Sequence, residues 1–285
     1  MGIISEKVVS RNRRPYRMMI ESYNSAQEMV RDLKTRSITN SSFQDKSRES
    51  FDSWEGVKTY EECLNYLSNG YQPTVEKLKE SIKPNVKGES KRISFKNDMV
   101  GGMPIVPLAM MGIPTSMVNT TIKPIKAKVI DIYYDITCAS RISSKEIIEA
   151  GQKLLATIMR FEQQGYKFNL YAVQTYSDDS SCDMLTIKVK SSSQPLDLKR
   201  MSYTLTHTSF FRVLGFDWYS RTPKGKYRSC YGKNLSYYFD FNGNKINEFA
   251  QQIFGKNSIY LSAMIMNENF RNRKDEYISS MINMK

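Results

Sequence analysis

The sequence predicts an α/β protein, a three-layer sandwich whose mainly parallel sheet occupies residues 123–285. Three consecutive segments carry this prediction. Residues 127–135 are rich in β-branched and aromatic side chains, which favour strands. Residues 144–164 repeat apolar side chains at the helical period. Residues 166–176 return to a strand-like pattern, and the order strand, helix, strand with short joints favours parallel neighbours.

Local signals mark where the central helix begins and ends. Ser143 and Glu146 have the spacing of a capping box, and Gly165 follows the last apolar position, where a left-handed cap is favoured. Further along, we expect strands at 183–190, 235–241 and 258–266, helices within 196–216 and at 245–254, and a short terminal helix.

Residues 1–50 are predicted to form a basic N-terminal arm and linker. Four arginines surround Pro15, namely Arg11, Arg13, Arg14 and Arg17. They fit contacts with phosphates, packing on an acidic neighbouring subunit, or a solvated tail. A helix is indicated near 22–35, followed by a serine-rich linker at 37–50.

Residues 51–122 are predicted to form a small helical region and a long irregular segment. Thr59 and Glu62 form a second capping box, Gly70 ends that helix, and another helix is expected at 74–82. The following stretch is rich in Gly, Pro and Met, and its prolines oppose a regular helix. We therefore expect an extended apolar ribbon that lies on the core or at a subunit contact.

Charge and hydropathy limit the classes of function. The chain has 42 basic and 29 acidic side chains, a net charge of +13, which favours nucleic acid, a membrane surface or an acidic protein face as partner. The same surplus also fits a lysine-rich protein from an AT-rich genome. No apolar run approaches the roughly 20 residues that cross a bilayer, and we expect neither a membrane span nor a signal peptide.

One basic segment combines cations with aromatic rings. Residues 221–233 contain five basic residues, two tyrosines and no acidic residue. Basic groups follow a phosphate backbone while rings stack on bases, so single-stranded nucleic acid is one expected ligand; a basic surface hairpin is the other interpretation. The candidate nucleic-acid contacts here are Lys224, Lys226, Tyr227, Arg228, Tyr231 and Lys233.

Cysteine and histidine content argues against several enzyme classes. Cys63, Cys138, Cys182 and Cys230 are scattered without a CxxC pair, and His207 is the only histidine. A structural zinc site needs four clustered ligands, so we expect no zinc and reduced thiols. The chain contains no complete catalytic motif, which predicts a non-enzymatic protein without a cofactor.

A set of short motifs resembles an uncharacterised protein family of bacteriophages and prophages over residues 50–220. The motifs are Trp54-x-Gly56, Tyr60-x-Glu62, Gly70-Tyr71 and Val100-Gly101-Gly102-x-Pro104. This resemblance implies a phage structural or accessory protein, located in the virion or the host cytoplasm. The expected partners are other phage or virion proteins, as this resemblance implies, and further copies of the chain. The basic arm and loop add DNA or RNA as an expected partner, and no membrane partner is expected.

The end of the first predicted strand resembles the metal-binding edge of von Willebrand factor A-like domains, on a sheet of that type or of the Rossmann type. Asp135 and Thr137 match that pattern, whereas Ala139 and Ser140 depart from it. The resemblance implies Mg²⁺ at Asp135 and Thr137; simple capping of the following turn is the alternative, and we favour it. Further oxygen ligands of such a cation would come from Asp178, Asp179, Thr206 and Thr208. A metal-dependent nucleic-acid-processing enzyme is a further alternative, and its carboxylates would come from Asp131, Asp135, Asp178 or Asp179.

Overall fold

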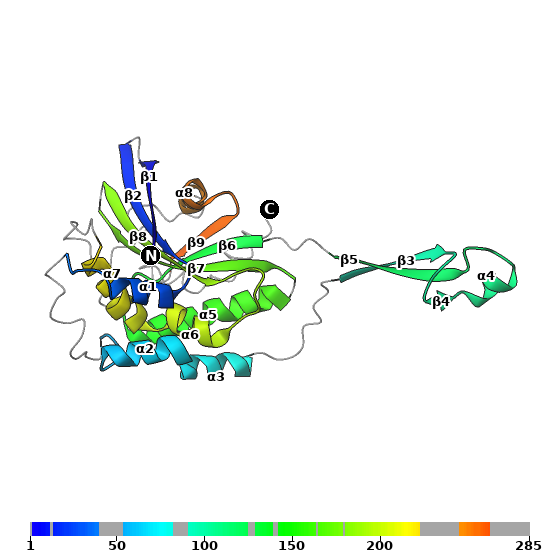
Figure 1. Ribbon diagram of the computed structural model, residues 1–285, viewed down its shortest axis with the longest axis horizontal. Helices are drawn as coiled ribbons and strands as arrows, with labels where there is room; N and C mark the ends of the chain where they lie inside the picture. Colours follow the sequence, from blue (N-terminus) through cyan, green and yellow to red (C-terminus); the bar gives the residue numbers. More distant parts are fainter. Residues whose placement is uncertain are drawn as a thin grey trace.

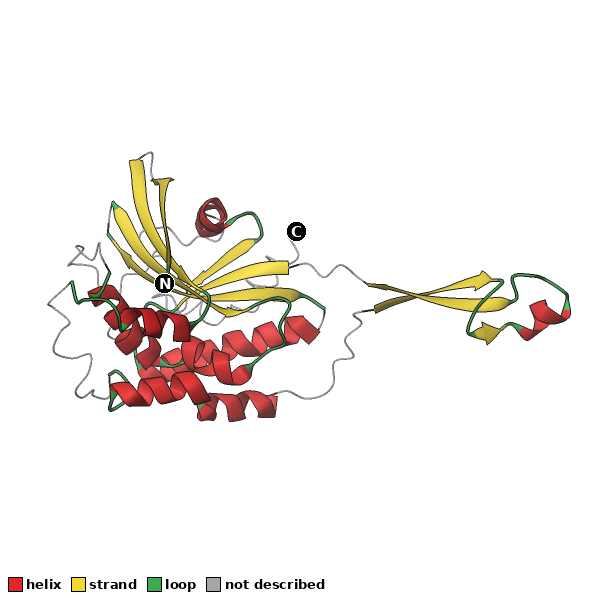
Figure 2. Cartoon of the chain, viewed as in Figure 1, coloured by secondary structure: helices red, strands yellow, loops and turns green. Residues whose placement is uncertain are grey.

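The computed structural model describes residues 2–11, 14–39, 54–81, 91–124, 129–138, 142–163, 165–178, 180–222 and 245–262. Its main feature is a strongly curled six-stranded sheet, shaped like half a barrel (Figures 1 and 2). The strand order is β1-β2-β8-β7-β6-β9. The strands are β1 (Ile3–Arg11), β2 (Arg14–Tyr23), β6 (Val129–Asp135), β7 (Lys167–Ser177), β8 (Ser181–Lys190) and β9 (Ser258–Ser262).

The predicted α/β class is confirmed, but the sheet is mixed rather than mainly parallel. β6 runs parallel to both β7 and β9, and β2 runs parallel to β8. The β1–β2 and β7–β8 pairs are antiparallel. Only residues 178–180 join β7 to β8, and so short a link cannot make the crossover that parallel strands require.

Helices cover both faces of the main sheet: α8 lies on the concave side, and the remaining helices, except α4 at the far end of a separate small sheet, lie on the convex side (Figures 1 and 2). The helix α5 (Ser144–Gln163) connects β6 to β7 along the convex face, and α8 (Lys245–Phe254) precedes β9. Both helices therefore lie where the sequence predicts them. The other helices are α1 (Ala26–Leu33), α2 (Tyr60–Asn69), α3 (Gln72–Ser81), α6 (Leu198–Thr206), the π-helix η2 (Phe210–Gly215) and α7 (Phe216–Ser220).

The predicted capping boxes form at the starts of α2 and α5. The Glu62 amide donates to the Thr59 hydroxyl at 3.2 Å. At α5, the Glu146 amide donates to the Ser143 hydroxyl at 3.3 Å while the Ser143 amide donates to the Glu146 carboxylate at 3.0 Å. Each pair satisfies amides that the first helical turn leaves without partners.

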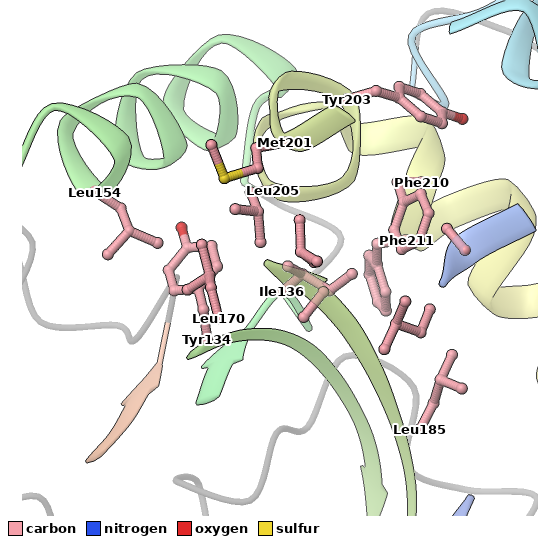
Figure 3. Packing of buried hydrophobic residues seen from close by; sticks show 14 of the residues in the cluster. Tyr134, Ile136, Leu154, Leu170, Leu185, Met201, Tyr203, Leu205, Phe210 and Phe211 are labelled. Atoms are coloured by element: carbon pink, nitrogen blue, oxygen red, sulfur yellow. The ribbon is translucent and has the colours of Figure 1, made fainter. Parts of the chain in front are cut away.

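The larger hydrophobic core lies between the convex face and the helices (Figure 3). Tyr134 and Leu170 from neighbouring strands meet Leu154 of α5 and Leu205 of α6 there, and all are at most 2% exposed. A smaller core on the concave face joins Tyr16, Met184 and Tyr260 to Ile253 of α8. Two apolar faces explain why β7 and β8 are buried almost continuously, as strands covered on both sides are.

The N-terminal segment differs from the expected flexible arm. Residues 3–11 and 14–23 form β1 and β2 of the main sheet. In β2, Tyr16, Met18 and Ile20 alternate toward the concave core, a pattern with the strand period that the neighbouring arginines obscure. The helix indicated at 22–35 is α1, which is shorter because residues up to Tyr23 belong to β2.

A three-stranded antiparallel sheet, which we call the projecting arm (residues 91–124), extends away from the main sheet (Figure 1). It contains β3 (Lys91–Asp98), β4 (Met103–Pro104), the short helix α4 (Val106–Met110) and β5 (Met117–Pro124), in the strand order β3-β5-β4. In the Gly-, Pro- and Met-rich segment 99–117, only residues 103, 104 and 117 lie in strands, and α4 is a short helix that includes Pro107, so the prediction of an extended ribbon is wrong for most of this segment. Its exposed side chains rule out the expectation that it lies on the core.

The predicted strand at 235–241, the terminal helix and residues 40–50 of the linker lie outside the described residues. Among the helices that the structure describes, none is both long and apolar enough to cross a membrane.

Candidate functional site

The end of the projecting arm displays large apolar side chains, and we call residues 95–111 the apolar tip. Seven side chains there are each at least 59% exposed: Phe95, Met99, Val100, Met103, Val106, Met110 and Met111. Residues 99–122 contain no charged residue. Exposed apolar surface on this scale is typical of sites where proteins associate, and methionine adapts its shape to a partner surface.

Close backbone packing explains why glycine stands at the base of the apolar tip. A Cβ atom at Gly101 would lie 2.3 Å from the carbonyl oxygen of Val118, and the Gly102 amide donates to the same carbonyl at 3.0 Å. The Ile105 amide donates to Ser116 at 2.7 Å. The Val100-Gly101-Gly102-x-Pro104 motif therefore lets the chain before β4 pass close to the backbone of β5.

Asp135 lies at the carboxyl end of β6, as predicted, but its side chain is fully buried. One carboxylate oxygen accepts the Thr137 amide at 2.9 Å. The other accepts the Thr175 hydroxyl at 2.9 Å and a short hydrogen bond from the Tyr260 hydroxyl. Burial raises the pKa of Asp135 to about 6, and the hydrogen bonds only partly offset that rise.

Thr137 is engaged with the neighbouring strand. Its hydroxyl oxygen accepts the Thr175 amide at 2.8 Å, which links the chain after β6 to β7 beyond their last paired residues, Asp135 and Val173. The described residues contain no group of three or more His, Cys, Asp or Glu side chains placed to hold a metal ion. The geometry around Asp135 and Thr137 is that of a capped strand end.

The other candidate oxygen ligands each have local partners. Asp131 accepts the Asn169 amide at 2.6 Å, Asp178 accepts amides of Ser180 and Ser181, and Thr208 donates to the Glu55 carbonyl at 3.0 Å. Thr206 lies 3.2 Å from the Thr74 hydroxyl. Asp179 and Ser140 lie outside the described residues. None of these contacts reaches Asp135, so the described residues do not form a shared site.

The predicted nucleic-acid residues are only partly described. Arg11 and Arg14 are paired at the end of the β1–β2 hairpin, and Arg14 and Arg17 are exposed. The hairpin therefore gathers basic residues at one end of the sheet. Arg13 and the segment with Lys224, Lys226, Tyr227, Arg228, Tyr231 and Lys233 lie outside the described residues.

His207 and the thiols are core groups. The His207 ring lies 4.5 Å from that of Tyr71, its Nδ1 atom is 2.9 Å from the Ser209 hydroxyl, and Ser209 is fully buried. Burial lowers the pKa of His207 to about 4, so the ring is neutral at pH 7. Cys63, Cys138 and Cys182 are free and buried, and burial raises the pKa of each.

The Trp54-x-Gly56 motif packs over the carboxyl end of β6 through Arg212, a residue that sequence reasoning missed. The Arg212 guanidinium lies 4.3 Å from the Trp54 ring centroid and donates to the Ile142 carbonyl at 2.8 Å. Gly56 has a φ of 78°, and a Cβ there would lie 2.6 Å from the Thr208 hydroxyl. The motif therefore contacts Arg212 and Thr208, although Trp54 is only partly buried and Gly56 is exposed. No local signal identifies Arg212, because its partners are distant in sequence.

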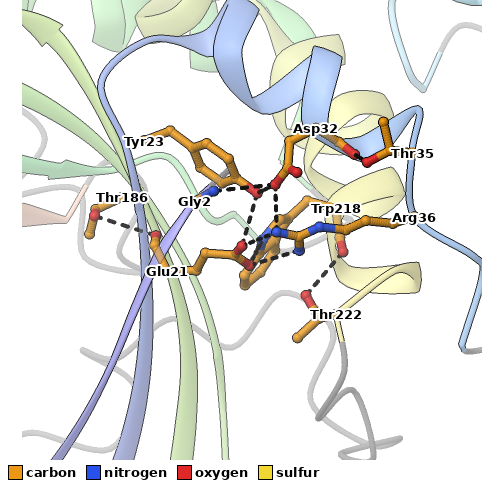
Figure 4. Close-up of polar contacts among 9 residues, drawn as sticks. All are labelled: Gly2, Glu21, Tyr23, Asp32, Thr35, Arg36, Thr186, Trp218 and Thr222. Carbon is orange, nitrogen blue, oxygen red and sulfur yellow. Dashed lines mark hydrogen bonds and ion pairs between the residues drawn. The ribbon is translucent and has the colours of Figure 1, made fainter.

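A second buried cluster centres on Glu21 of β2 (Figure 4). Its carboxylate is fully buried, pairs with the Arg36 guanidinium and accepts the Trp218 indole N–H at 2.8 Å. Arg36 also pairs with Asp32 at 2.5 Å. The cluster ties β2 to α1 and α7. The sequence signal for this cluster is a carboxylate that directly follows the apolar residues 18–20.

Comparison with protein families identifies the family of this chain. A profile described as a domain of unknown function, DUF7192, matches residues 6–281. The chain belongs to the DUF7192 family. Its match covers the main sheet, the covering helices and the projecting arm, so all are parts of one DUF7192 domain. Comparisons with curated proteins and with solved structures give no match.

Proposed function

We propose that this DUF7192 protein is a non-enzymatic assembly protein that associates with copies of itself through the apolar tip. The seven exposed apolar side chains at the tip carry this proposal. Transfer of such side chains from water to a protein contact is favourable by about 25 cal/mol per Å² of buried area. The phage origin and the virion or host-cytoplasm location implied by the short motifs remain parts of the proposal, with virion proteins as further partners.

The test compares association of the wild type with that of a variant whose tip carries charge. Met110 and Met111 are 84% and 74% exposed, so Met110→Lys with Met111→Lys leaves the buried core unchanged. Removing both methionines from a contact costs roughly 3 kcal/mol, or roughly 100-fold in the association constant. Size-exclusion chromatography with light scattering over a concentration series measures this change.

A matched control adds the same charge to the same arm without removing apolar surface. Asn119→Lys with Thr120→Lys serves, because both residues are exposed on β5. We expect this control to associate like the wild type. A wild type that stays monomeric at roughly 100 µM, where micromolar contacts would be occupied, or equal loss in both variants, would reject the proposal.

A metal-dependent binding domain is the alternative. Its support is that β6, β7 and β9 are parallel, and ligands of such sheets bind beyond the carboxyl ends of the strands; Asp135 lies at that end. The Asp135 carboxylate is completely buried and its oxygens accept hydrogen bonds from the protein. This arrangement argues against a metal ligand, and we therefore favour the assembly role. Calorimetric titration of the wild type and Asp135→Ala with Mg²⁺ distinguishes the two proposals. Only a metal site predicts a heat of Mg²⁺ binding that the substitution abolishes.

A further inference from the structure

A cavity of about 330 Å³ opens on the concave face between β1, β2 and α8. Figure 1 shows α8 facing these strands across the opening of the curled sheet. The volume of the cavity is at the lower end of the range for small-molecule sites, which suits one compact ligand. The lining combines aromatic rings, two lysines and hydroxyl groups, and each of these implies a different part of a ligand.

One wall of the cavity is a row of stacked rings. Tyr133 and Tyr171 are partners in the parallel register of β6 and β7, and their ring centroids lie 4.5 Å apart at an interplanar angle of 5°. Phe254, from the last turn of α8, stacks on Tyr133 at 3.7 Å. Tyr171 and Phe254 are only partly buried. Burial raises the pKa of both tyrosines, so their phenols are neutral at pH 7.

Lys188 places a cation beside this wall. It is the antiparallel partner of Tyr171 on β8, and its ammonium lies 5.9 Å from the Tyr171 ring centroid. No carboxylate of the described residues forms an ion pair with Lys188. Lys7, the other lysine, donates to the Ile253 carbonyl at the end of α8. Asp131 contributes negative potential at Tyr171, but it is hydrogen-bonded to Asn169 and does not line the cavity.

Hydroxyl groups line the opposite side. Ser22 and Thr186 face each other in the parallel register of β2 and β8, and their hydroxyl oxygens are 2.7 Å apart. Ser5 of β1 is exposed beside them. Each hydroxyl can donate one hydrogen bond and accept others, so this side suits a ligand with ring oxygens or hydroxyl groups.

We propose that the cavity binds one nucleotide unit, either a free nucleotide or one residue of a single strand. The base would pack against the aromatic wall, the phosphate would pair with Lys188, and the sugar would face Ser5 and Ser22. A bare anion would make no use of the rings, and a purely apolar ligand would leave Lys188 and the hydroxyls unused. Combined stacking and positive charge is how proteins bind single-stranded nucleic acid without sequence preference.

The test is calorimetric titration of the full chain with adenosine monophosphate, adenosine and a short oligothymidylate. Lys188→Gln should weaken binding of the monophosphate roughly 10-fold because a charge-assisted contact is lost, and it should leave adenosine unaffected. Tyr171→Leu should weaken all three ligands roughly 10-fold, through lost stacking. Preference for the oligonucleotide would identify a strand as the source of the nucleotide, and preference for the monophosphate a free nucleotide.

The matched control is Lys153→Gln, which removes the same charge from the exposed side of α5 on the other face of the sheet. It should bind like the wild type. Circular dichroism checks that each variant is folded, and ultraviolet crosslinking of a bromouridine-containing strand should label residues 167–190. Absence of binding by the wild type at low salt, or equal weakening by Lys188→Gln and Lys153→Gln, would overturn the proposal. Because the charged-tip variant keeps this cavity, its binding distinguishes failure here from failure of the assembly role.

Discussion

At the residue scale, burial decides the charge state of Asp183 in β8. The side chain is 2% exposed, on the convex face of the sheet, and its Oδ2 atom has no hydrogen-bond partner among the described residues. Burial, with a smaller contribution from the charge of Asp178, raises the pKa of Asp183 to about 7. The folded state therefore binds this proton more tightly than the unfolded chain, where the pKa is about 3.9.

We predict that Asp183→Asn stabilises the protein at high pH. Because the folded pKa is raised, the stabilising contribution of the proton is present below about pH 4 and is lost as the pH rises through about 7. At pH 8 the carboxylate costs roughly 2 to 4 kcal/mol, which the neutral amide avoids. Urea unfolding should show a large gain for the variant at pH 8 and a much smaller gain at pH 5.

Asp178→Asn is the control for that experiment, in the same β7–β8 hairpin. Partial burial raises the pKa of Asp178, but hydrogen bonds from Ser180 and Ser181 outweigh it and leave the pKa below its usual value. The sign is therefore opposite, and this variant should lose stability at pH 8. Equal shifts in the two variants would show that burial does not govern Asp183.

Single residues also show the limit of sequence reasoning about the site. Asp135 and Thr137 were correctly placed at a strand end, because strand pattern and following polar residues are local features. The contacts of the carboxylate with Tyr260 and Thr175 could not be predicted, because these residues lie 40 or more positions from Asp135 in the sequence.

At the element scale, the contact between α5 and α6 depends on a glycine. A Cβ atom at Gly151 would lie 2.4 Å from the Leu205 carbonyl oxygen and 2.8 Å from the Thr206 Cα atom. Both neighbours are backbone atoms, so a side chain there would force the helices apart. The apolar stripe of α5 was predictable from its period, whereas this close approach was not.

We predict that Gly151→Ala destabilises the fold despite the better helix propensity of alanine. Overpacking costs about 1 to 3 kcal/mol and the propensity gain is about 1 kcal/mol, so we expect a net loss of up to about 2 kcal/mol. The urea midpoint should fall with an unchanged slope. Lys153→Ala, on the exposed side of the same helix, should change stability by less than about 0.5 kcal/mol. An unchanged Gly151→Ala midpoint would contradict the close approach.

Elements were predicted well where their signals are local. The caps at Thr59 and Ser143 and the helices around them follow from residues within one turn. The direction of β8 was predicted less well, because the sheet was expected to be mainly parallel. Only three residues link β7 to β8, and so short a link indicates a hairpin. The sequence supports this inference only when the strand ends are known.

At the scale of the whole molecule, curvature separates two environments. The convex face carries most of the helices, whereas the concave face holds α8, the smaller core and the cavity beside Lys188. Strand β1 completes the curl, so the first residues of the chain help to form that cavity. The projecting arm lies apart from both faces (Figure 1), which leaves its apolar tip available to a second copy.

The sequence by itself determined the α/β class, the caps and spans of the main helices, and the positive charge, because these depend on residues close together in the chain. Tertiary structure alone decided that the N-terminal segment joins the sheet, that the Met-rich ribbon projects, and that Glu21 and Asp183 are buried. Those outcomes depend on contacts between segments far apart in sequence, and the energies of such contacts cannot be predicted from local sequence patterns.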